Sequence, residues 1–317
     1  MIQRAHFVED KEAIIRLWQQ CFGDERHYVE FFLENCPKEN ALFLYRKKDV
    51  VVGMMFLMPG MLKVPADIGE SEECAVQIKD DEKIHPQKIY YLYALCVDEK
   101  YRGRGIANEL LDFAKDYAGK DNAELCLVPG SSNLRKYYAQ RGFVDVFVCT
   151  EQEINVDTSM MYGGVIRKAD IDIEDLIKAR TEIYVSSVFL WNADNLDFAM
   201  KENAYSGGVA WSIETDGIEA ETELSSCLTF SNAIPYIIGD VDGKVLQVRE
   251  TNLKLPVVYR IAFEYNCDRV RFLDIKEPFE NYPIHTVSYA MMADTMCVEE
   301  FVKSIRFDKR YINFCFD

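Results

Sequence analysis

A short turn at residues 101–105 carries residue types that could hold a phosphate group. It follows the continuous apolar run 90–97 and leads directly into an amphipathic helical pattern. A strand–turn–helix junction of this kind leaves several backbone N–H groups unpaired beside the positive end of the helix dipole. Two glycines, Gly103 and Gly105, remove side chains where phosphate oxygens would approach the backbone. The turn therefore predicts a pyrophosphate site, to which Arg102 and Arg104 can add positive charge.

Two common phosphate-binding loops do not fit this turn. A Walker loop requires G-x-x-x-x-G-K-[ST], and the chain contains no such run. A dinucleotide-binding fingerprint requires G-x-G-x-x-G, but Asn108 stands where the third glycine is needed. One alternative stays open on these residues alone, namely a turn whose glycines serve only the backbone geometry.

A second cluster of residues lies downstream, after one predicted strand, at 133–143. Together the two segments resemble the GCN5-related N-acetyltransferase (GNAT) superfamily over about residues 1–150. The first signature of that family, [RQ]-x-x-G-x-[GA], is met by Arg102, Gly105 and Ala107. The later signature is met in loose form by Asn133, Tyr138, Gly142 and Phe143. One departure is the bulky pair Lys136 and Tyr137, where the family often has a small residue.

The resemblance implies a site for acetyl-CoA between two strands that diverge, 91–97 and 124–128. It implies that backbone groups of one strand pair with the pantetheine arm, and these are Leu95, Cys96 and Val97. It implies that the N–H groups of the turn hold the pyrophosphate, and these are Arg102, Gly103, Arg104, Gly105, Ile106 and Ala107. Asn133 would hydrogen-bond the cofactor, and Tyr138 would protonate the leaving thiolate.

The chemistry assigned to Tyr138 is sound on its own terms. Attack of an amine on a thioester requires that a proton be supplied to the sulfur. A phenol whose pKa is near 10 stays protonated at neutral pH and can donate that proton. A strand N–H near 95–97 would stabilise the carbonyl oxygen. The alternative is that Tyr138 is an aromatic residue that packs a short helix onto the sheet, and Tyr137 is the neighbour most easily mistaken for it.

The elements that would position these residues follow from hydrophobic periodicity. We expect strands at 2–7, 41–46, 50–58, 90–97, 124–128 and 143–150, with a turn at 47–49. We expect helices over 106–117 and 134–140, a helix near 27–35, and a first helix with Asp10 at its N-cap.

The second half partly repeats this order. The helix start at 172–178 resembles the one at 10–16, and a strand at 244–251, a helix at 256–265 and a strand at 269–274 follow. The polar stretch 151–164 separates the halves. We therefore predict an α/β (α+β) chain with two tandem GNAT-like domains, each a mixed, mostly antiparallel sheet flanked by helices. Residues 1–155 would form the catalytic domain. Residues 165–317 would form a degenerate domain that shapes the acceptor cleft, because the turn 250–256 has no glycine.

Taken whole, the chain resembles the bacterial tandem-domain GNAT proteins related to the Eis acetyltransferases, although it is short for their additional C-terminal domain. In that group the C-terminal carboxylate reaches the active site as a base, which implies Asp317 here. The alternative for the alternating apolar segment 311–317 is packing alone. Other carboxylate and imidazole candidates for the base or for binding the amine are Glu25, Glu72, Glu73, His27 and His85.

Composition limits the other classes of function. The formal net charge of −17 argues against non-specific nucleic-acid binding and is compatible with a cationic acceptor. The ten cysteines are scattered singly, which favours reduced thiols and no metal site. No apolar run is long enough to span a membrane, and the N-terminus lacks the apolar core of a signal peptide. We expect a cytoplasmic protein without a membrane partner, and a homo-oligomer is compatible with the sequence.

These features predict an acetyl-CoA-dependent N-acetyltransferase that acts on a primary amine of a small molecule or peptide. The alternative is a non-catalytic acyl-CoA-binding or regulatory protein with the same fold. A longer acyl donor and any of several amine acceptors remain open at this point.

Overall fold

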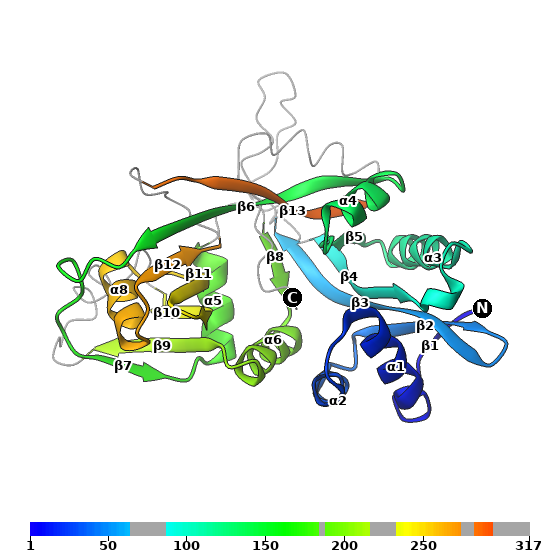
Figure 1. Cartoon of the computed structure of the whole chain (residues 1–317), viewed down its shortest axis with the longest axis horizontal. Coiled ribbons are helices and arrows are strands. Elements are labelled where there is room, and N and C mark those ends of the chain that lie inside the picture. The colour runs from blue at the N-terminus through cyan, green and yellow to red at the C-terminus, as the bar shows by residue number, and fades with distance from the viewer. Residues whose placement is uncertain (64–86, 184–187, 216–232, 274–281, 294–317) are drawn as a thin grey trace, which may run out of the picture. The chain divides into compact units, whose positions relative to one another are not determined.

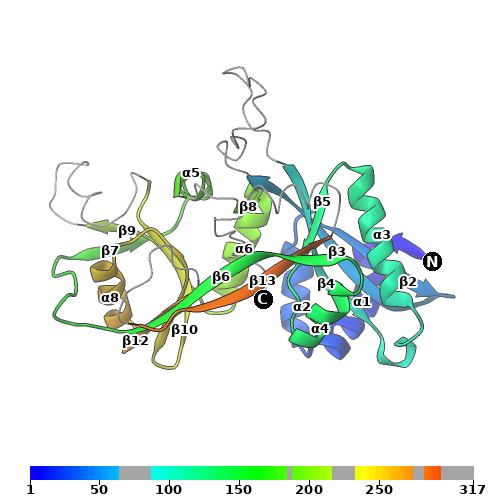
Figure 2. The same ribbon diagram turned by 90° about the horizontal axis from the view of Figure 1, so that it is seen from above.

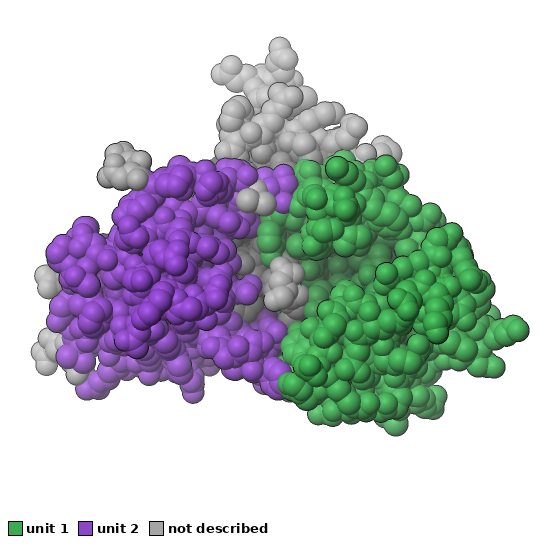
Figure 3. Space-filling view, viewed as in Figure 1, with its two compact units in different colours: residues 1–146, 189–198, 289–308 green, residues 147–188, 199–288, 309–317 purple. Residues whose placement is uncertain are grey.

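The computed structural model describes residues 1–63, 87–183, 188–215, 233–273 and 282–293. Within these residues the chain forms two compact units, which are coloured separately in Figure 3. Unit 1 contains residues 1–146 together with 189–198 and the described residues 289–293, from later in the sequence. Unit 2 begins at Phe147 and contains the other described residues. The assignment of 1–155 and 165–317 to two functional domains stays a prediction.

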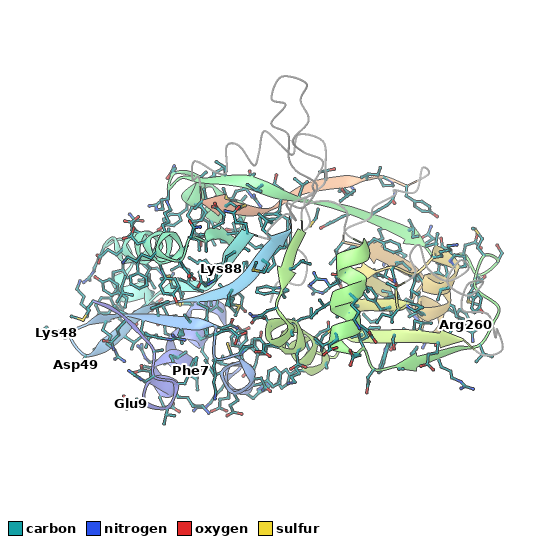
Figure 4. All side chains as sticks on the ribbon, turned by 180° about the vertical axis from the view of Figure 1, so that it is seen from behind. Phe7, Glu9, Lys48, Asp49, Lys88 and Arg260 are labelled. Atoms are coloured by element: carbon teal, nitrogen blue, oxygen red, sulfur yellow. The ribbon has the colours of Figure 1, made fainter. Side chains whose placement is uncertain are left out.

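Unit 1 holds the first strands and helices of the chain (Figure 1). They are β1 (Ile2–Arg4), α1 (Phe7–Phe22), α2 (Arg26–Asn35), β2 (Ala41–Lys47), β3 (Val50–Lys63), β4 (Gln87–Val97), the 3-10 turn η2 (Glu99–Tyr101), α3 (Ile106–Lys120), β5 (Glu124–Leu127) and α4 (Ser132–Ala139). The predicted turn between β2 and β3 is confirmed: Lys48 has a φ of 55°, and Figure 4 shows Lys48 and Asp49 at its tip.

The sheet of unit 1 has the strand order β1-β2-β3-β4-β5, followed by β13 (His285–Ala293), and β8 (Val188–Trp191) pairs with β3. Neighbours from β1 to β4 are antiparallel, whereas β4 and β5 are parallel. Helix α3 lies on one face of the sheet, and helices α1 and α2 lie on the other (Figure 1). The predicted mixed, mostly antiparallel sheet with flanking helices is therefore confirmed.

Successive residues of β4 point to opposite faces and so serve both layers. Leu92 belongs to the core beneath α3, where Leu110, Leu111 and Ala114 are also buried. Its neighbour Tyr93 stacks on the ring of Phe32 from α2, with ring centroids 5.6 Å apart. Strand β4 thus packs against α3 on one face of the sheet and against α2 on the other.

The start of α1 differs from the prediction. The helix begins at Phe7 with His6 at the N-cap, so Asp10 lies inside the first turns (Figure 4 labels Phe7 and Glu9). The Asp10 carboxylate accepts a hydrogen bond from the backbone N–H of His6 at 3.0 Å and pairs with Arg46. Asp10 therefore satisfies the helix N-terminus from within, because a carboxylate in the first turns can reach back to the N-cap N–H.

Unit 2 repeats the same topology. Its elements include β7 (Ile166–Ala169), α5 (Ile173–Ile183), β9 (Val209–Thr215), β10 (Tyr236–Asp242), β11 (Val245–Thr251), α8 (Leu255–Glu264) and β12 (Arg269–Phe272). The order β7-β9-β10-β11-β12 reproduces β1-β2-β3-β4-β5, with antiparallel neighbours up to β11 and a parallel pair β11–β12. The predicted duplication of one α/β unit is confirmed at the level of strand order.

Each unit takes a further strand from the other half of the sequence. Strand β6 (Phe143–Asn155) follows α4, yet its residues 152–155 pair with β12 in unit 2. Strand β13 follows β12, yet Met291 and Met292 pair with β5 in unit 1. Figure 2 shows these two long strands as green and orange ribbons. Helix α6 (Ala193–Tyr205) likewise has residues in both units.

Candidate functional site

The edge of β4 that faces β5 is only partly paired. The two strands pair at three positions, Ile89–Glu124, Tyr90–Leu125 and Tyr91–Cys126, and β5 ends one residue later. Within the described part of the chain no other strand is recorded on this edge of residues 92–97. Backbone groups on such an edge are available to a ligand that lies along it as a strand would.

A bulge interrupts β4 within this unpaired stretch. Met54 lies opposite Cys96 and Phe56 lies opposite Tyr93, so Ala94 and Leu95 together face one residue of β3. Ala94 has a φ of 50°, in the left-handed region that non-glycine residues seldom occupy. A bulge re-aims the backbone and leaves a residue outside the regular ladder. This places the irregular backbone next to Leu95, Cys96 and Val97, the predicted pantetheine-binding residues.

The glycine turn leaves the N–H groups that follow Arg102 open, whereas the N–H groups of Tyr101 and Arg102 donate to the carbonyls of Asp98 and Glu99. Gly103 and Gly105 have φ values of 72° and 81°, and Gly105 is the N-cap of α3. The N–H of Glu109 bonds the Gly105 carbonyl at 3.0 Å, so the N–H groups of Ile106, Ala107 and Asn108 precede the first helical bond. A Cβ atom at either glycine would meet no atom within 4 Å. The surface above the turn is therefore open, as an anion site requires.

The two arginines of the turn behave differently. The Arg102 Nε donates to the Val97 carbonyl at 3.0 Å, so this side chain ties the turn to the end of β4. The Arg104 guanidinium lies over the ring of Tyr101, 5.2 Å from its centroid, and is exposed. Arg104 therefore lies at the open surface of the turn, where its charge can face a ligand. Arg102 instead stabilises the junction between β4 and the turn through its hydrogen bond to Val97.

Helix α4 presents the second predicted cluster. Ser131 is its N-cap and accepts from the N–H of Leu134 at 3.2 Å. Asn133 is exposed in the first turn of the helix. The arrangement leaves the Asn133 amide available to a ligand.

Tyr137 and Tyr138 have distinct surroundings although they are adjacent. The Tyr137 hydroxyl donates to Asn108 Oδ1 at 2.9 Å, and the Arg141 guanidinium stacks on its ring at 3.5 Å. The Tyr138 ring is buried, with 7% exposure, and packs edge-on against Phe143. Among the described residues, no side-chain hydrogen bond is recorded for the Tyr138 hydroxyl. Burial raises the pKa of Tyr138 to about 12.

Two features of this region were not anticipated from the sequence. Asn108 serves as a common acceptor for Tyr137 and for Arg141 Nε, which lies 2.6 Å away, and it links α3 to α4. Cys21, in the last turn of α1, lies 3.7 Å from the Val97 carbonyl and 3.9 Å from Arg102 Nη2. No sequence signal indicates either link, because each joins residues far apart in the chain.

The other candidates lie elsewhere or outside the described residues. Glu25 is the exposed N-cap of α2, and His27 is exposed in the first turn of that helix. Glu72, Glu73, His85 and Asp317 fall outside the described residues. Among the residues that the structure describes, no group of three or more His, Cys, Asp or Glu side chains could hold a metal ion. No helix in the same residues is long and apolar enough to cross a membrane.

The equivalent turn of unit 2 is closed by its own side chains. Asn252 Oδ1 accepts from the Tyr236 N–H at 2.8 Å, and its Nδ2 donates to the Ile234 carbonyl at 2.7 Å. The Leu253 N–H donates to Thr251 Oγ1 at 3.1 Å, and the Leu253 side chain is buried. Proline occupies the first turn of α8 and removes one N–H donor. The turn therefore offers fewer open N–H groups than residues 103–108 do.

Known proteins share this fold. A probable N-acyltransferase from Enterococcus faecalis V583 superposes with a TM-score of 0.65 at 13% identity, covering 92% of this chain and 72% of that one. A GCN5-related N-acetyltransferase from Kribbella flavida gives 0.62 at 12% identity, covering 92% and 70%. Eis1 from Mycobacterium abscessus gives 0.60 at 9% identity, covering 92% and 73%. At these identities the likeness concerns the fold.

Sequence comparison is more limited. No curated protein matches the chain. Residues 11–143 match the model of the acetyltransferase (GNAT) family, and this range contains the bulged strand, the glycine turn and helix α4. Residues 11–143 therefore form a domain of the acetyltransferase (GNAT) family.

Proposed function

We propose that the protein is an N-acetyltransferase that moves an acetyl group from acetyl-CoA to a primary amine. The observation that carries the proposal is the continuity of three features in unit 1: the unpaired edge of β4, the bulge at Ala94, and the open glycine turn that follows the strand. A ligand with a pyrophosphate at one end and amide groups along its length matches this series of backbone donors and acceptors.

Each part of the site would have one task. The N–H groups from Gly103 to Ala107 would bind the pyrophosphate, whereas the Arg102 N–H, predicted to join them, already donates to the Glu99 carbonyl at 3.3 Å. Asn133 would hydrogen-bond the cofactor. The backbone of Leu95, Cys96 and Val97 would pair with the pantetheine amides, and one N–H there would stabilise the carbonyl oxygen. The bulge supports this role because it turns backbone groups out of the ladder with β3.

Tyr138 is the proposed general acid. Its raised pKa keeps the phenol protonated throughout the neutral range, so the hydroxyl can donate as negative charge develops on sulfur. The contrast with Tyr137 supports the assignment, because the Tyr137 hydroxyl already donates to Asn108. Asp317, implied by the resemblance to the Eis group, is proposed as the base that deprotonates the amine. Removing Asp317 should then lower kcat without weakening acetyl-CoA binding.

The acceptor would be a small-molecule or peptide amine. The net charge of −17 supports a cationic acceptor, since a negative surface raises the local concentration of an ammonium group. In this proposal all residues that bind the cofactor belong to unit 1, so cofactor binding does not depend on unit 2.

Calorimetric titration of the full chain with acetyl-CoA tests the proposal. We expect binding at one site per chain, because among the described residues the open glycine turn occurs in unit 1 and the equivalent turn 250–256 of unit 2 has no glycine. Failure to bind at millimolar ligand would contradict the cofactor assignment.

The second candidate, a non-catalytic acyl-CoA-binding protein, is distinguished by product formation. We expect release of free CoA when acetyl-CoA is mixed with a panel of primary amines. Binding without CoA release across polyamines, amino sugars, amino acids and lysine peptides would favour the non-catalytic protein. Repeating the release assay with longer acyl-CoA donors would establish the donor.

A further inference from the structure

Two cysteine thiols meet between α1 and β4 beside the proposed cofactor strand. Cys21 lies against β4 beside Cys96, which follows it by 75 positions in the chain, and the Cys96 thiol donates a hydrogen bond to the Cys21 sulfur. Cys21 also lies 3.7 Å from the Val97 carbonyl and 3.9 Å from Arg102 Nη2. Cys21 is partly exposed, whereas Cys96 is buried. The pair therefore combines one accessible sulfur with one protected sulfur.

The surroundings of Cys21 favour its thiolate. The hydrogen bond from Cys96, followed by the hydrogen bond and charge of Arg102, lowers the pKa of Cys21 to about 7, against the opposing effects of burial and Asp98. About half of such a thiol is ionised at pH 7, against a few per cent of an ordinary cysteine. Burial raises the pKa of Cys96, so this residue remains a thiol. The thiolate is the form that reacts with oxidants.

Three other described cysteines, Cys36, Cys126 and Cys267, differ from Cys21 in the direction of their pKa shift. Burial raises the pKa of Cys36 and Cys126, and it also raises that of Cys267. The pKa of Cys21 is lowered, in contrast to the raised pKa of these three cysteines and of Cys96. A low thiol pKa, partial exposure and an adjacent second thiol together characterise redox-sensitive cysteine pairs.

We propose that Cys21 and Cys96 form a reversible disulfide on exposure to peroxide and that this disulfide weakens acyl-CoA binding. The chemistry balances with hydrogen peroxide as the oxidant. The Cys21 thiolate attacks one peroxide oxygen, the O–O bond breaks, and the second oxygen leaves as hydroxide, which takes a proton to become water. The Cys96 sulfur then attacks the Cys21 sulfenic acid, and its proton accompanies the departing hydroxide as a second water.

The consequence for binding follows from the position of Cys96. This residue lies in β4 between the bulge at Ala94 and the Val97 carbonyl that Arg102 holds. A disulfide has no S–H to donate to Val97, and it draws the Cys96 backbone toward α1. Both changes disturb the strand edge and the brace that precedes the glycine turn. This part of the inference rests on the proposed acyl-CoA site.

The test is a peroxide titration of the full-length protein followed by peptide mapping. We expect a Cys21–Cys96 crosslinked peptide with the loss of two hydrogens, reversed by dithiothreitol. In parallel, the affinity for acetyl-CoA should fall about tenfold on oxidation and return on reduction. Saturating acetyl-CoA should slow the oxidation, because coupling between the two events is reciprocal.

Matched variants identify the two steps. Cys21→Ser should abolish the crosslink, Cys96→Ser should leave a sulfenic acid on Cys21 that dimedone traps, and Cys267→Ser should behave as the parent. Modification of Cys21 by glutathione or by higher oxidation, without the crosslinked peptide, would overturn the proposed disulfide. Peptide mapping of the parent protein gives this result even if the Cys96→Ser variant does not fold. A crosslink that leaves acetyl-CoA affinity unchanged would overturn the coupling. If the reduced protein does not bind acetyl-CoA, the proposed function fails while the crosslink result stands.

Discussion

The fourth strands of the two repeats end in different ways. Both carry an extra residue that breaks the register with the preceding strand, at Ala94 and Leu95 in β4 and at Arg249 in β11. After the break, β4 leads to an open glycine turn. In contrast, β11 leads to a turn in which Thr251 accepts from the Leu253 N–H and Asn252 accepts from the N–H of Tyr236 in β10. The repeats therefore share the strand geometry, and they differ in whether the helix start is open to an anion.

Strand β11 of unit 2 also takes part in a buried polar network. Glu250 pairs with Arg180 from α5 at 3.0 Å and accepts from the Tyr236 hydroxyl at 2.6 Å, and all three side chains are buried. A buried ion pair of this kind requires a well-packed, water-excluding setting. A bulged strand next to a helix is thus compatible with two uses, the proposed ligand binding in unit 1 and internal support in unit 2.

The largest expected effect tests whether the chemistry resides in unit 1. Tyr138→Phe should lower kcat about 100-fold, the effect typical of losing a general acid, with little change in acetyl-CoA affinity. Tyr137→Phe is the matched control, because it removes a hydroxyl that is bonded to Asn108. Initial rates of CoA release measure both. Equal kcat values for the parent and Tyr138→Phe would remove Tyr138 from the mechanism.

The next effect concerns the glycine turn. Gly105→Val places a β-branched residue at a φ of 81° and a side chain where phosphate would lie. The strain of about 1–2 kcal/mol should be relieved by moving the turn, which weakens acetyl-CoA binding about tenfold or more. Gly119→Ala, in α3 with open space around it, should leave affinity unaltered. Calorimetry on both variants checks this, and parental affinity in Gly105→Val would show that the turn geometry serves no ligand.

A third prediction compares two asparagines, Asn252 in the turn of unit 2 and Asn133 in helix α4 of unit 1. Asn252→Ala leaves the Tyr236 N–H without its acceptor, so unit 2 should lose about 1–3 kcal/mol of stability while acetyl-CoA affinity stays the same. Asn133→Ala should do the reverse, because Asn133 is exposed and its amide is open to a ligand. Urea midpoints and calorimetry separate the two outcomes. A fall in cofactor affinity for Asn252→Ala would mean that unit 2 also binds it.

The smallest expected effect is electrostatic. Arg104→Ala removes an exposed charge above the glycine turn and should weaken acetyl-CoA binding about threefold, more at low ionic strength than at high. Arg260 (labelled in Figure 4) lies on the equivalent helix α8, and Arg260→Ala should leave the affinity for acetyl-CoA unchanged. Titrations at two salt concentrations check both. A salt-independent loss would mean that Arg104 acts through packing on Tyr101.

Local patterns in the sequence predicted much of unit 1. The apolar run 90–97, the glycines and the amphipathic pattern after them lie within β4, the turn and α3, and the repeated order in the second half matches β11, α8 and β12. The N-cap of α1 was predicted wrongly at Asp10. The Asp10 carboxylate does accept the N–H of the N-cap residue His6, but Asp10 itself lies inside the helix. Its ion pair with Arg46 of β2 joins segments that are distant in the sequence.

The candidate site divides in the same way. Gly103 and Gly105 were recognisable because a turn with positive φ favours glycine whatever surrounds it. The links of Asn108 to Tyr137 and Arg141, and of Cys21 to Cys96, were not recognisable, because each joins different elements.

The sequence by itself determined the order of strands and helices, the open glycine turn in the first repeat and the loss of glycine in the second. These features depend on backbone preferences and on periodicity within a few residues. Only the tertiary structure decided that β13 completes the sheet of unit 1 while β6 extends into unit 2, and that β4 bulges at Ala94. It also decided that the Tyr137 hydroxyl donates to Asn108, whereas the Tyr138 hydroxyl has no hydrogen-bond partner within the described part of the chain. Strand pairing and side-chain partners are set by contacts between distant segments, and those contacts leave no local pattern in the chain.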